Sequence, residues 1–258
     1  MKVVILCGGQ GTRLKEETEF KPKPLVEIGG MPILWHIMKI YSHYGFRDFI
    51  LCLGYKGHMI KNFFLNYDKI TKDFTFNPKS NILTRHGEND MEDWNITFAE
   101  TGLKSETGSR IKQIEKYVDG DNFLLTYGDG VSNVNIKELL DFHLSHGKIG
   151  TVTSVRPSTR FGLLDIEENN TISDFKKKHL IHEGWIDGGF FAFNKRIFNY
   201  LTTDESCMLE GEPLKNLAKE GQFMAYKHKD FWQCMDTIRD ATYLNNLWET
   251  NPLWKVWE

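Results

Sequence analysis

The first two dozen residues limit the choice of fold more than any other stretch of this chain. Residues 3–6 are all apolar, and three glycines follow almost at once, at Gly8, Gly9 and Gly11. A short apolar run that ends in a glycine cluster is typical of a strand buried on both faces of a parallel sheet. Because glycine has no Cβ, the backbone N–H groups of this turn are free to face an anion.

Two cationic side chains follow the glycine cluster. Arg13 carries a planar fork of donors that matches phosphate oxygens, and Lys23, in a Lys-Pro-Lys-Pro run, offers a point charge. The two common phosphate loops do not fit. No G-x-x-x-x-G-K-S/T string is present, and Leu14 stands where a dinucleotide loop has its third glycine. The stretch therefore predicts a phosphate site of a different kind.

The rest of the chain alternates between helix and strand patterns. Apolar residues recur at helical spacing over 31–44, a second apolar strand covers 48–53, and further strands are expected at 95–100 and 122–127. This alternation predicts a doubly wound, Rossmann-like α/β fold with a mostly parallel mixed sheet and C-terminal helices. We expect a single domain over 1–258.

Two segments stand out from this rhythm. Residues 68–93 are polar with short strand-like pieces, and we interpret them as a small β insertion that packs on the domain or serves assembly. Residues 237–258 hold a helix and an apolar, Trp-rich tail, which we expect to dock on the body or on a neighbouring subunit. Between them, Ser109 is expected to cap a helix over 110–117.

Composition excludes several classes of protein. Apolar residues make up 40% of the chain, enough for a full core, and the net charge of −3 provides no basic field for nucleic acid. No apolar run approaches the ~20 residues of a membrane span. The cysteines, Cys7, Cys52, Cys207 and Cys234, are scattered and form no C-x-x-C pair. We expect a cytoplasmic protein without nucleic-acid or membrane partners.

Two aspartates stand at positions suited to a metal ion. Asp129 lies between Gly128 and Gly130 after the expected strand at 122–127, where α/β sheets place ligand chemistry. Asp236 precedes the last expected helix. Taken singly, Asp129 could serve as a turn residue and Asp236 as a helix cap. The phosphate loop upstream favours the metal interpretation for Asp129.

The motifs together resemble the sugar-nucleotide pyrophosphorylase (nucleotidylyltransferase) family. The first string, LCGGQGTRL at 6–14, is shared across that family. Others are similar to its glucose-1-phosphate cytidylyltransferase branch along nearly the whole chain: KPKPLVEIGG at 21–30, PILWHIM at 32–38, GYKG at 54–57, WNIT at 94–97, YGDGV at 127–131, FWQ at 231–233, MDT at 235–237 and WKVWE at 254–258.

The resemblance implies a reaction and a set of site residues. A phosphate on an acceptor attacks the α-phosphorus of CTP, which gives a CDP-activated product and pyrophosphate. The acceptor is a phosphorylated sugar like glucose 1-phosphate or a related polyol phosphate. The implied catalytic residues are Arg13 and Lys23, and one Mg²⁺ is held by Asp129 and Asp236. The implied nucleotide contacts are Leu6, Cys7, Gly8, Gly9, Gly11, Thr12, Arg13, Lys23, Ser105, Arg110 and Gly128.

The chain departs from the family in its acceptor-binding part, residues 159–194. The family has Glu-Lys-Pro where this chain has Lys177-Lys178-His179, and an Asn where it has Asp187. The resemblance keeps Lys178 on the acceptor phosphate and Gly162 beside the acceptor. Either Lys177 and Asp187 have exchanged charges with glucose 1-phosphate still bound, or the acceptor differs, as in synthesis of a CDP-polyol or CDP-glycerol type.

Other functions and the assembly state are also open. A metal-dependent glycosyltransferase usually presents D-x-D, whereas Gly128-Asp129-Gly130 has one acid. A nucleotide-sensing relative without acceptor chemistry is the other alternative. We expect a homo-oligomer, with the 68–93 insertion or the tail at the interface, because Trp254 and Trp257 are too apolar to be left in water.

Overall fold

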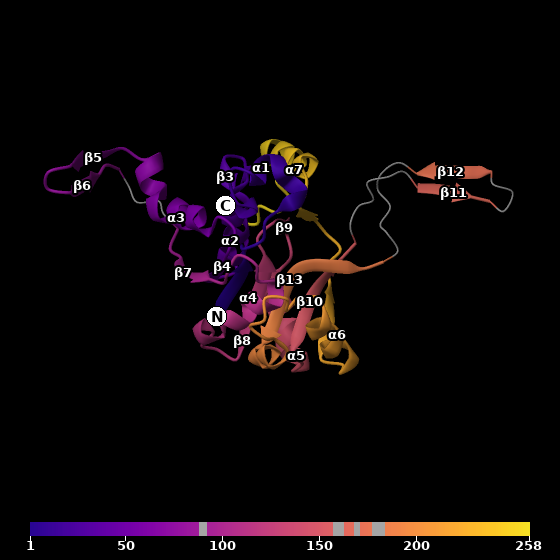
Figure 1. Ribbon diagram of the computed structural model, residues 1–258. Helices are drawn as coiled ribbons and strands as arrows, with labels where there is room; N and C mark the ends of the chain where they lie inside the picture. Colours follow the sequence, from indigo (N-terminus) through magenta and orange to yellow (C-terminus); the bar gives the residue numbers. More distant parts are fainter. Residues whose placement is uncertain (88–91, 157–162, 168–170, 177–183) are drawn as a thin grey trace.

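A seven-stranded mixed sheet forms the centre of the protein (Figure 1). The computed structural model describes residues 1–87, 92–156, 163–167, 171–176 and 184–258. The sheet has the order β14-β10-β13-β8-β1-β4-β7. Its strands are β1 (Lys2–Leu6), β4 (Asp48–Leu53), β7 (Asn95–Glu100), β8 (Asn122–Tyr127), β10 (Gly150–Val155), β13 (Ile186–Asn194) and β14 (Phe223–Lys227).

The sheet is mostly parallel, as expected. Strand β1 pairs in parallel with β4 on one side and β8 on the other, β4 with β7, and β10 with β14. Only β13 runs antiparallel, between β8 and β10. The α/β fold predicted from the alternating pattern is therefore confirmed.

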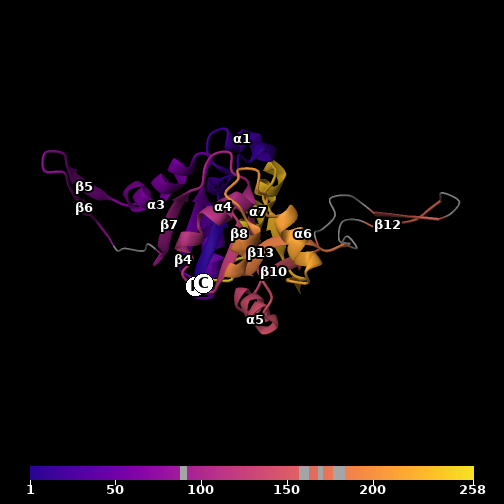
Figure 2. The ribbon, with the colours of Figure 1, turned by 60° about the horizontal axis from the view of Figure 1, so that its bottom comes forward.

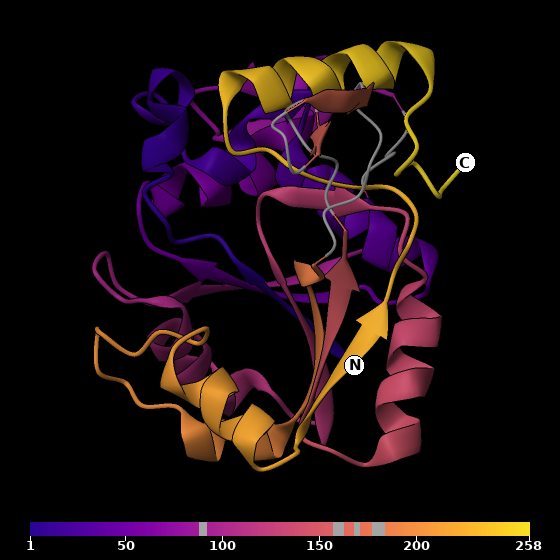
Figure 3. The same ribbon diagram turned by 90° about the vertical axis from the view of Figure 1, so that its right-hand side faces the viewer.

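Helices cover both faces of the sheet, so the central strands are buried on both faces. The helical elements are α1 (Lys15–Thr18), α2 (Ile33–His43), α3 (Gly57–Thr71), α4 (Thr107–Gln113), α5 (Ile136–His146), α6 (Glu212–Lys219), α7 (Ile238–Thr250) and the 3-10 turns η1 (Thr12–Leu14), η2 (Lys23–Leu25), η3 (Glu115–Tyr117) and η4 (Lys195–Tyr200). In β1, Val3 and Ile5 join the core beneath α2 and α5, whereas Val4 joins the core beneath α4 and α6. Figure 3 shows α5 and the helical segment after β13 on opposite sides of the strands.

Two hairpins project from opposite sides of this body (Figures 1 and 2). One is β5 (Phe74–Asn77) with β6 (Ile82–Arg85), and the other is β11 (Leu163–Ile166) with β12 (Ile172–Lys176). The first is the β hairpin of the expected insertion, but it extends away from the domain and all of β5 is exposed. Small pairs, β2 (Glu27–Ile28) with β3 (Met31–Pro32) and β9 (Gly130–Ser132) with β15 (Trp232–Cys234), complete the described strands.

Local patterns misassigned two features. Ser109 lies inside α4 rather than at its cap; the capping position is Glu106, and Ser109 Oγ donates to the Thr203 carbonyl at 3.2 Å. Strand β14 was not predicted as part of the sheet, because its short half-buried sequence becomes a strand only by pairing with β10.

The Trp-rich tail packs on the body of its own chain. Trp254 is fully buried and its ring stacks on Phe231 with centroids 5.8 Å apart. Its indole Nε1 donates to His36 at 3.4 Å, and Trp257 meets Trp35 edge-on. Burial lowers the pKa of His36 to about 4, so this histidine is neutral at pH 7. The apolar tail is thus explained by intramolecular packing.

Candidate active site

A cavity of about 570 Å³ opens at the carboxyl ends of β1 and β8. Strand β1 pairs with β4 on one side and with β8 on the other, so the order of strands along the chain reverses direction at β1. Ligands of α/β sheets bind at such a switch point. A second cavity of about 350 Å³ adjoins the first and shares Arg13, Tyr127 and Asp129 with it. The two form one continuous site with two halves.

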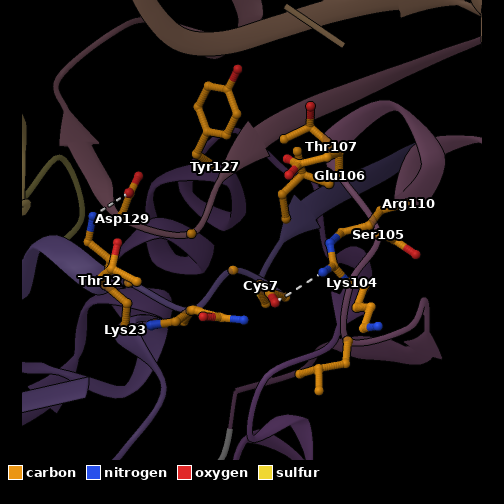
Figure 4. A pocket seen from close by; sticks show the side chains of 18 of the residues that line it. Cys7, Thr12, Lys23, Lys104, Ser105, Glu106, Thr107, Arg110, Tyr127 and Asp129 are labelled. Carbon is orange, nitrogen blue, oxygen red and sulfur yellow. Dashed lines mark hydrogen bonds and ion pairs between the residues drawn. The ribbon is translucent and has the colours of Figure 1, made fainter. Parts of the chain in front are cut away.

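The larger half collects every nucleotide contact that the resemblance implied. Its lining includes Leu6, Cys7, Gly8, Gly9, Gly11, Thr12, Arg13, Lys23, Ser105, Arg110, Gly128 and Asp129. In Figure 4, Lys23 and Asp129 lie on one side of this cavity and the stretch from Lys104 to Arg110 on the other. Burial raises the pKa of the Cys7 thiol, so this cysteine is an inert part of the wall.

The Arg110 side chain holds the glycine loop in place. Its side chain is buried, and its Nη1 donates to the carbonyls of Leu53 at 3.2 Å and Gly102 at 2.7 Å. Nη1 also donates to Thr101 Oγ1 at 2.8 Å, and Nη2 donates to the Gly8 carbonyl at 3.1 Å. One guanidinium therefore ties β1, β4 and the loop after β7 together. Arg110 therefore holds in place the glycine loop that lines the larger cavity.

Gly8 is required by this arrangement. A Cβ at Gly8 would fall 2.2 Å from Arg110 Nη1, whereas a Cβ at Gly9 would meet nothing within 4 Å. We expect Gly8→Ala to displace the guanidinium and to lower the free energy of unfolding by about 2–3 kcal/mol. Gly9→Ala is the matched control and should leave the stability of the ligand-free protein unchanged or slightly higher. Urea unfolding of both variants measures this, and equal stabilities would contradict the proposed packing.

A cluster of charges spans the boundary between the two halves. Lys23 Nζ contacts Asp129 Oδ2 at 2.7 Å and Asp236 Oδ1 at 2.5 Å. Arg13 Nη1 contacts the other oxygen of Asp236, Oδ2, at 2.7 Å. Lys23 is only 8% exposed and is held in η2, whereas Arg13 is held in the 3-10 turn that follows the left-handed Gly11. Residues more than 100 positions apart in the chain thus meet at one point.

The pKa shifts in this cluster follow its geometry. Burial disfavours the charged form of Lys23, but the two carboxylates outweigh it and raise the pKa of the ammonium. Burial likewise opposes ionisation of Asp236, yet Lys23 and Arg13 lower the pKa of its carboxyl group. Lys23 and Asp236 are therefore both charged at neutral pH.

The donor set also fits a divalent cation. One cationic nitrogen, Lys23 Nζ, already sits between Asp129 and Asp236, so the two carboxylates converge on a single point. Hard oxygen ligands suit Mg²⁺, which keeps several water or phosphate ligands and needs few from the protein. Among the described residues, no group of three or more His, Cys, Asp or Glu could form a fuller metal cage.

The smaller half is lined by acids and aromatic side chains. Asp187 accepts a hydrogen bond from the Gly189 N–H at 2.7 Å, and Trp232 Nε1 donates to the Gly188 carbonyl at 2.7 Å. Tyr127 donates its phenol O–H to Glu210, and both residues line this cavity. This half contains Asp187, which was predicted as an acceptor residue, and Asp236, which was predicted as a metal ligand. The other predicted acceptor residues, Gly162, Lys177 and Lys178, lie outside the described residues.

Sequence reasoning missed Tyr127, Trp232 and Glu210 as site residues. Tyr127 and Trp232 belong to strings that carried the family resemblance, so a closer reading of those strings could have suggested them. Glu210 lies in a stretch without any recognisable motif, and only the folded chain brings it to the cavity.

Asp187 should make stability depend on pH. Removal from water, with repulsion from Glu210, raises the pKa of Asp187 to about 6. An unfolded Asp has a pKa of ~3.9, so between these values the folded state binds more protons and stability falls as pH rises. Relative to wild type, Asp187→Asn should therefore gain melting temperature from about pH 4 to pH 7 and then level off. Thermal unfolding from acid to neutral pH measures this; a gain independent of pH would contradict the assignment.

The fold and the site define the class of the protein. It is an α/β protein with a glycine loop and two cations placed for a polyphosphate, beside two carboxylates that suit a divalent cation. The chain belongs to the nucleotidyl transferase family, whose model matches residues 2–249. This confirms the family expected from the glycine loop and the Lys-Pro-Lys-Pro run.

Relatives of known description narrow the family to one branch. The chain is 49% identical over 260 residues to the glucose-1-phosphate cytidylyltransferase of Salmonella typhi, with both chains covered completely. It is 44% identical over 258 residues to the probable glucose-1-phosphate cytidylyltransferase of Bacillus subtilis, again over the whole of both. Among solved structures, HddC from Yersinia pseudotuberculosis has a TM-score of 0.69 at 23% identity, covering 96% of this chain and 99% of that one, a likeness of fold.

Proposed function

We propose that this protein is a glucose-1-phosphate cytidylyltransferase that joins the CMP part of CTP to glucose 1-phosphate and releases pyrophosphate, giving CDP-glucose. The observation that carries the proposal is the two-part cavity: the Lys23–Asp129–Asp236 cluster stands where the larger half, which we propose for the nucleotide, meets the smaller half, which we propose for the acceptor. Full-length identity of 44–49% to enzymes of this description supports it. Family membership decides against the glycosyltransferase alternative.

The reaction needs placement and charge neutralisation rather than a nucleophile from the protein. An oxygen of the acceptor phosphate forms a bond to the α-phosphorus, and the bond from that phosphorus to the pyrophosphate oxygen breaks. Backbone N–H groups near Gly11 and the Arg13 fork would hold the β- and γ-phosphates, and Lys23 would hold the α-phosphate. The ion pairs of these cations with Asp236 and Asp129 keep both side chains in place at the cavity.

Asp129 and Asp236 would hold the metal ion of this reaction. A Mg²⁺ ion in this place would offset phosphate charge and orient the triphosphate. Each carboxylate has more acceptor positions than its contacts with Lys23 and Arg13 use, so both acids could also hold the ion. The chain's own part is to keep both carboxylates in one place: Asp129 follows β8, and the Asp236 N–H donates to Asp240, which is part of the capping box of α7.

Pyrophosphate release tests the function directly. The purified protein is mixed with CTP, Mg²⁺ and, in turn, glucose 1-phosphate, other sugar 1-phosphates and glycerol 3-phosphate. We expect the highest kcat/KM with glucose 1-phosphate and CTP, and much lower values with UTP or GTP. A higher kcat/KM with a polyol phosphate would favour the changed-acceptor alternative. CTP binding without any pyrophosphate release would favour a sensing role.

We also propose a homo-oligomer that assembles through the β5–β6 hairpin. Phe74, Phe76 and Ile82 on this hairpin are 43%, 47% and 60% exposed, which is unusual for side chains of this size on a projecting arm. The tail no longer requires an interface, since Trp254 is buried within its own chain. Sedimentation at micromolar concentration should give an oligomer, and Phe76→Lys should shift it toward monomer. A monomeric wild type would contradict this proposal.

A further inference from the structure

Glu210 is a carboxylate in the smaller cavity that the proposed mechanism leaves without a role. It precedes α6 and lines this cavity together with Asp187 and Trp232. Its neighbour Leu209 is fully buried, and the Leu209 N–H donates to Thr107 Oγ1 at 2.8 Å. The backbone next to Glu210 is therefore held in place, and the Glu210 side chain projects from this fixed backbone.

Both oxygens of Glu210 are held by hydroxyl groups. Tyr127 donates its phenol O–H to Oε1, and Thr107 donates Oγ1–H to Oε2 at 2.6 Å. A carboxylate has about four acceptor positions, so each oxygen of Glu210 keeps one for a ligand. Two fixed donors set the plane of the carboxylate in advance, which lowers the cost of ordering it when a ligand binds.

The charges around the cavity leave Glu210 without a cation. Lys23 and Arg13 pair with Asp129 and Asp236, and within the part of the chain that the structure describes no ion pair joins Glu210. An ionised carboxylate in a cavity binds best to groups that donate hydrogen bonds. Neutral hydroxyl groups of a sugar are such donors, and the Trp232 ring beside them offers an apolar surface to the sugar ring.

We propose that Glu210 determines acceptor specificity, with its carboxylate accepting hydrogen bonds from hydroxyl groups of the phosphorylated sugar. This inference rests on the proposed cytidylyltransferase function. It also supplies from the loop before α6 the acceptor-side carboxylate that the family carries where this chain has Lys177. Glu210 lines the smaller half, and its hydrogen bond to Thr107, which lines the larger half, places it next to the boundary between the two.

The test compares Glu210→Gln and Glu210→Ala with wild type. We expect both variants to raise the KM for glucose 1-phosphate by about 10- to 100-fold, because each loses a hydrogen bond between a sugar hydroxyl and a charged carboxylate. The KM for CTP should stay within about twofold, because this hydrogen bond is made to the acceptor and not to CTP. Glu212→Ala is the matched control. It removes the same charge two residues away, from an exposed side chain that contacts Lys215 outside the site, and should behave as wild type.

Analogues of glucose 1-phosphate that each lack one hydroxyl make the test specific. Wild type should discriminate against at least one of them by about 10- to 100-fold in kcat/KM, and in Glu210→Ala that discrimination should fall to about threefold or less. Two results would overturn the inference: discrimination that persists in Glu210→Ala, or a CTP KM that rises as much as the acceptor KM. Either result would mean that Glu210 has a structural role and does not select the acceptor. A wild type that releases no pyrophosphate with any sugar phosphate would overturn the proposed function itself, and the inference with it.

Discussion

Replacing Lys23 with alanine should lower kcat for CTP by about a thousandfold. In the free protein its ammonium is buried between Asp129 and Asp236, 2.7 and 2.5 Å from their oxygens, so it is already placed where the α-phosphate charge would develop. Lys21→Ala is the matched control: Lys21 pairs with Glu17 and Glu27, away from the charge cluster, so this substitution should leave the rate constants unchanged. Steady-state kinetics with CTP and glucose 1-phosphate measure both variants.

Lys23→Ala should also leave a signature that does not depend on activity. Without the ammonium, Asp129 and Asp236 face each other with only Arg13 to compensate them, so the melting temperature at pH 7 should fall. Lys23 lowers the pKa of Asp236, so its stabilising effect exists above the unfolded pKa of ~3.9 and is lost as pH falls through the folded pKa. The deficit of the variant should therefore shrink in acid. A normal kcat, or a deficit that grows in acid, would refute this role.

Removing either acid of the proposed metal site should have an effect of similar size. Asp129→Ala and Asp236→Ala should each lower kcat/KM by about a thousandfold or more, because the reaction then lacks one of two carboxylate ligands for its divalent cation. Asp230→Ala is the control, since Asp230 is exposed on the nearby loop and its carboxylate accepts a hydrogen bond from the Phe231 N–H.

Metal binding can be followed without turnover. Titration of Mn²⁺, detected by electron paramagnetic resonance, should show tighter binding to wild type with CTP present than without it, because the triphosphate would add oxygen ligands to those of Asp129 and Asp236. Neither Asp variant should bind Mn²⁺ tightly in the CTP complex beyond what CTP binds alone. Near-normal turnover and Mn²⁺ binding in Asp236→Ala would remove that residue from the metal site.

Much of the fold could be predicted from local patterns. The strands at 48–53, 95–100 and 122–127 coincide with β4, β7 and β8, since each is a continuous apolar or β-branched run between turn residues. The last helix, α7, also follows its pattern from Ile238 to Thr250, with the Thr237–Asp240 capping box at its start. The edge strand β14 could not be predicted, because its pairing partner decides it.

The residues proposed for function also fall into two groups: those whose role could be inferred from the sequence and those whose role needed the structure. The glycine loop, Arg13 and Lys23 lie within one short stretch, so their chemistry could be inferred from their spacing alone. The roles of Arg110 and Glu210 could not. Arg110 has the charge of a phosphate ligand, but its burial under Gly8 commits its guanidinium to backbone carbonyls. Glu210 belongs to no motif, and it reaches the cavity through hydrogen bonds to Tyr127 and Thr107.

The sequence by itself determined the family, most of the strands and helices, and the glycine loop with its two cations, because these depend on residues that are near one another along the chain. Only the tertiary structure decided which charges meet. Lys23 and Asp236 are separated by 213 positions, and their contact exists because β1 and β8 are neighbours and α7 packs over β2. Such a contact carries no local periodicity, so it follows from packing the whole core and not from any single stretch.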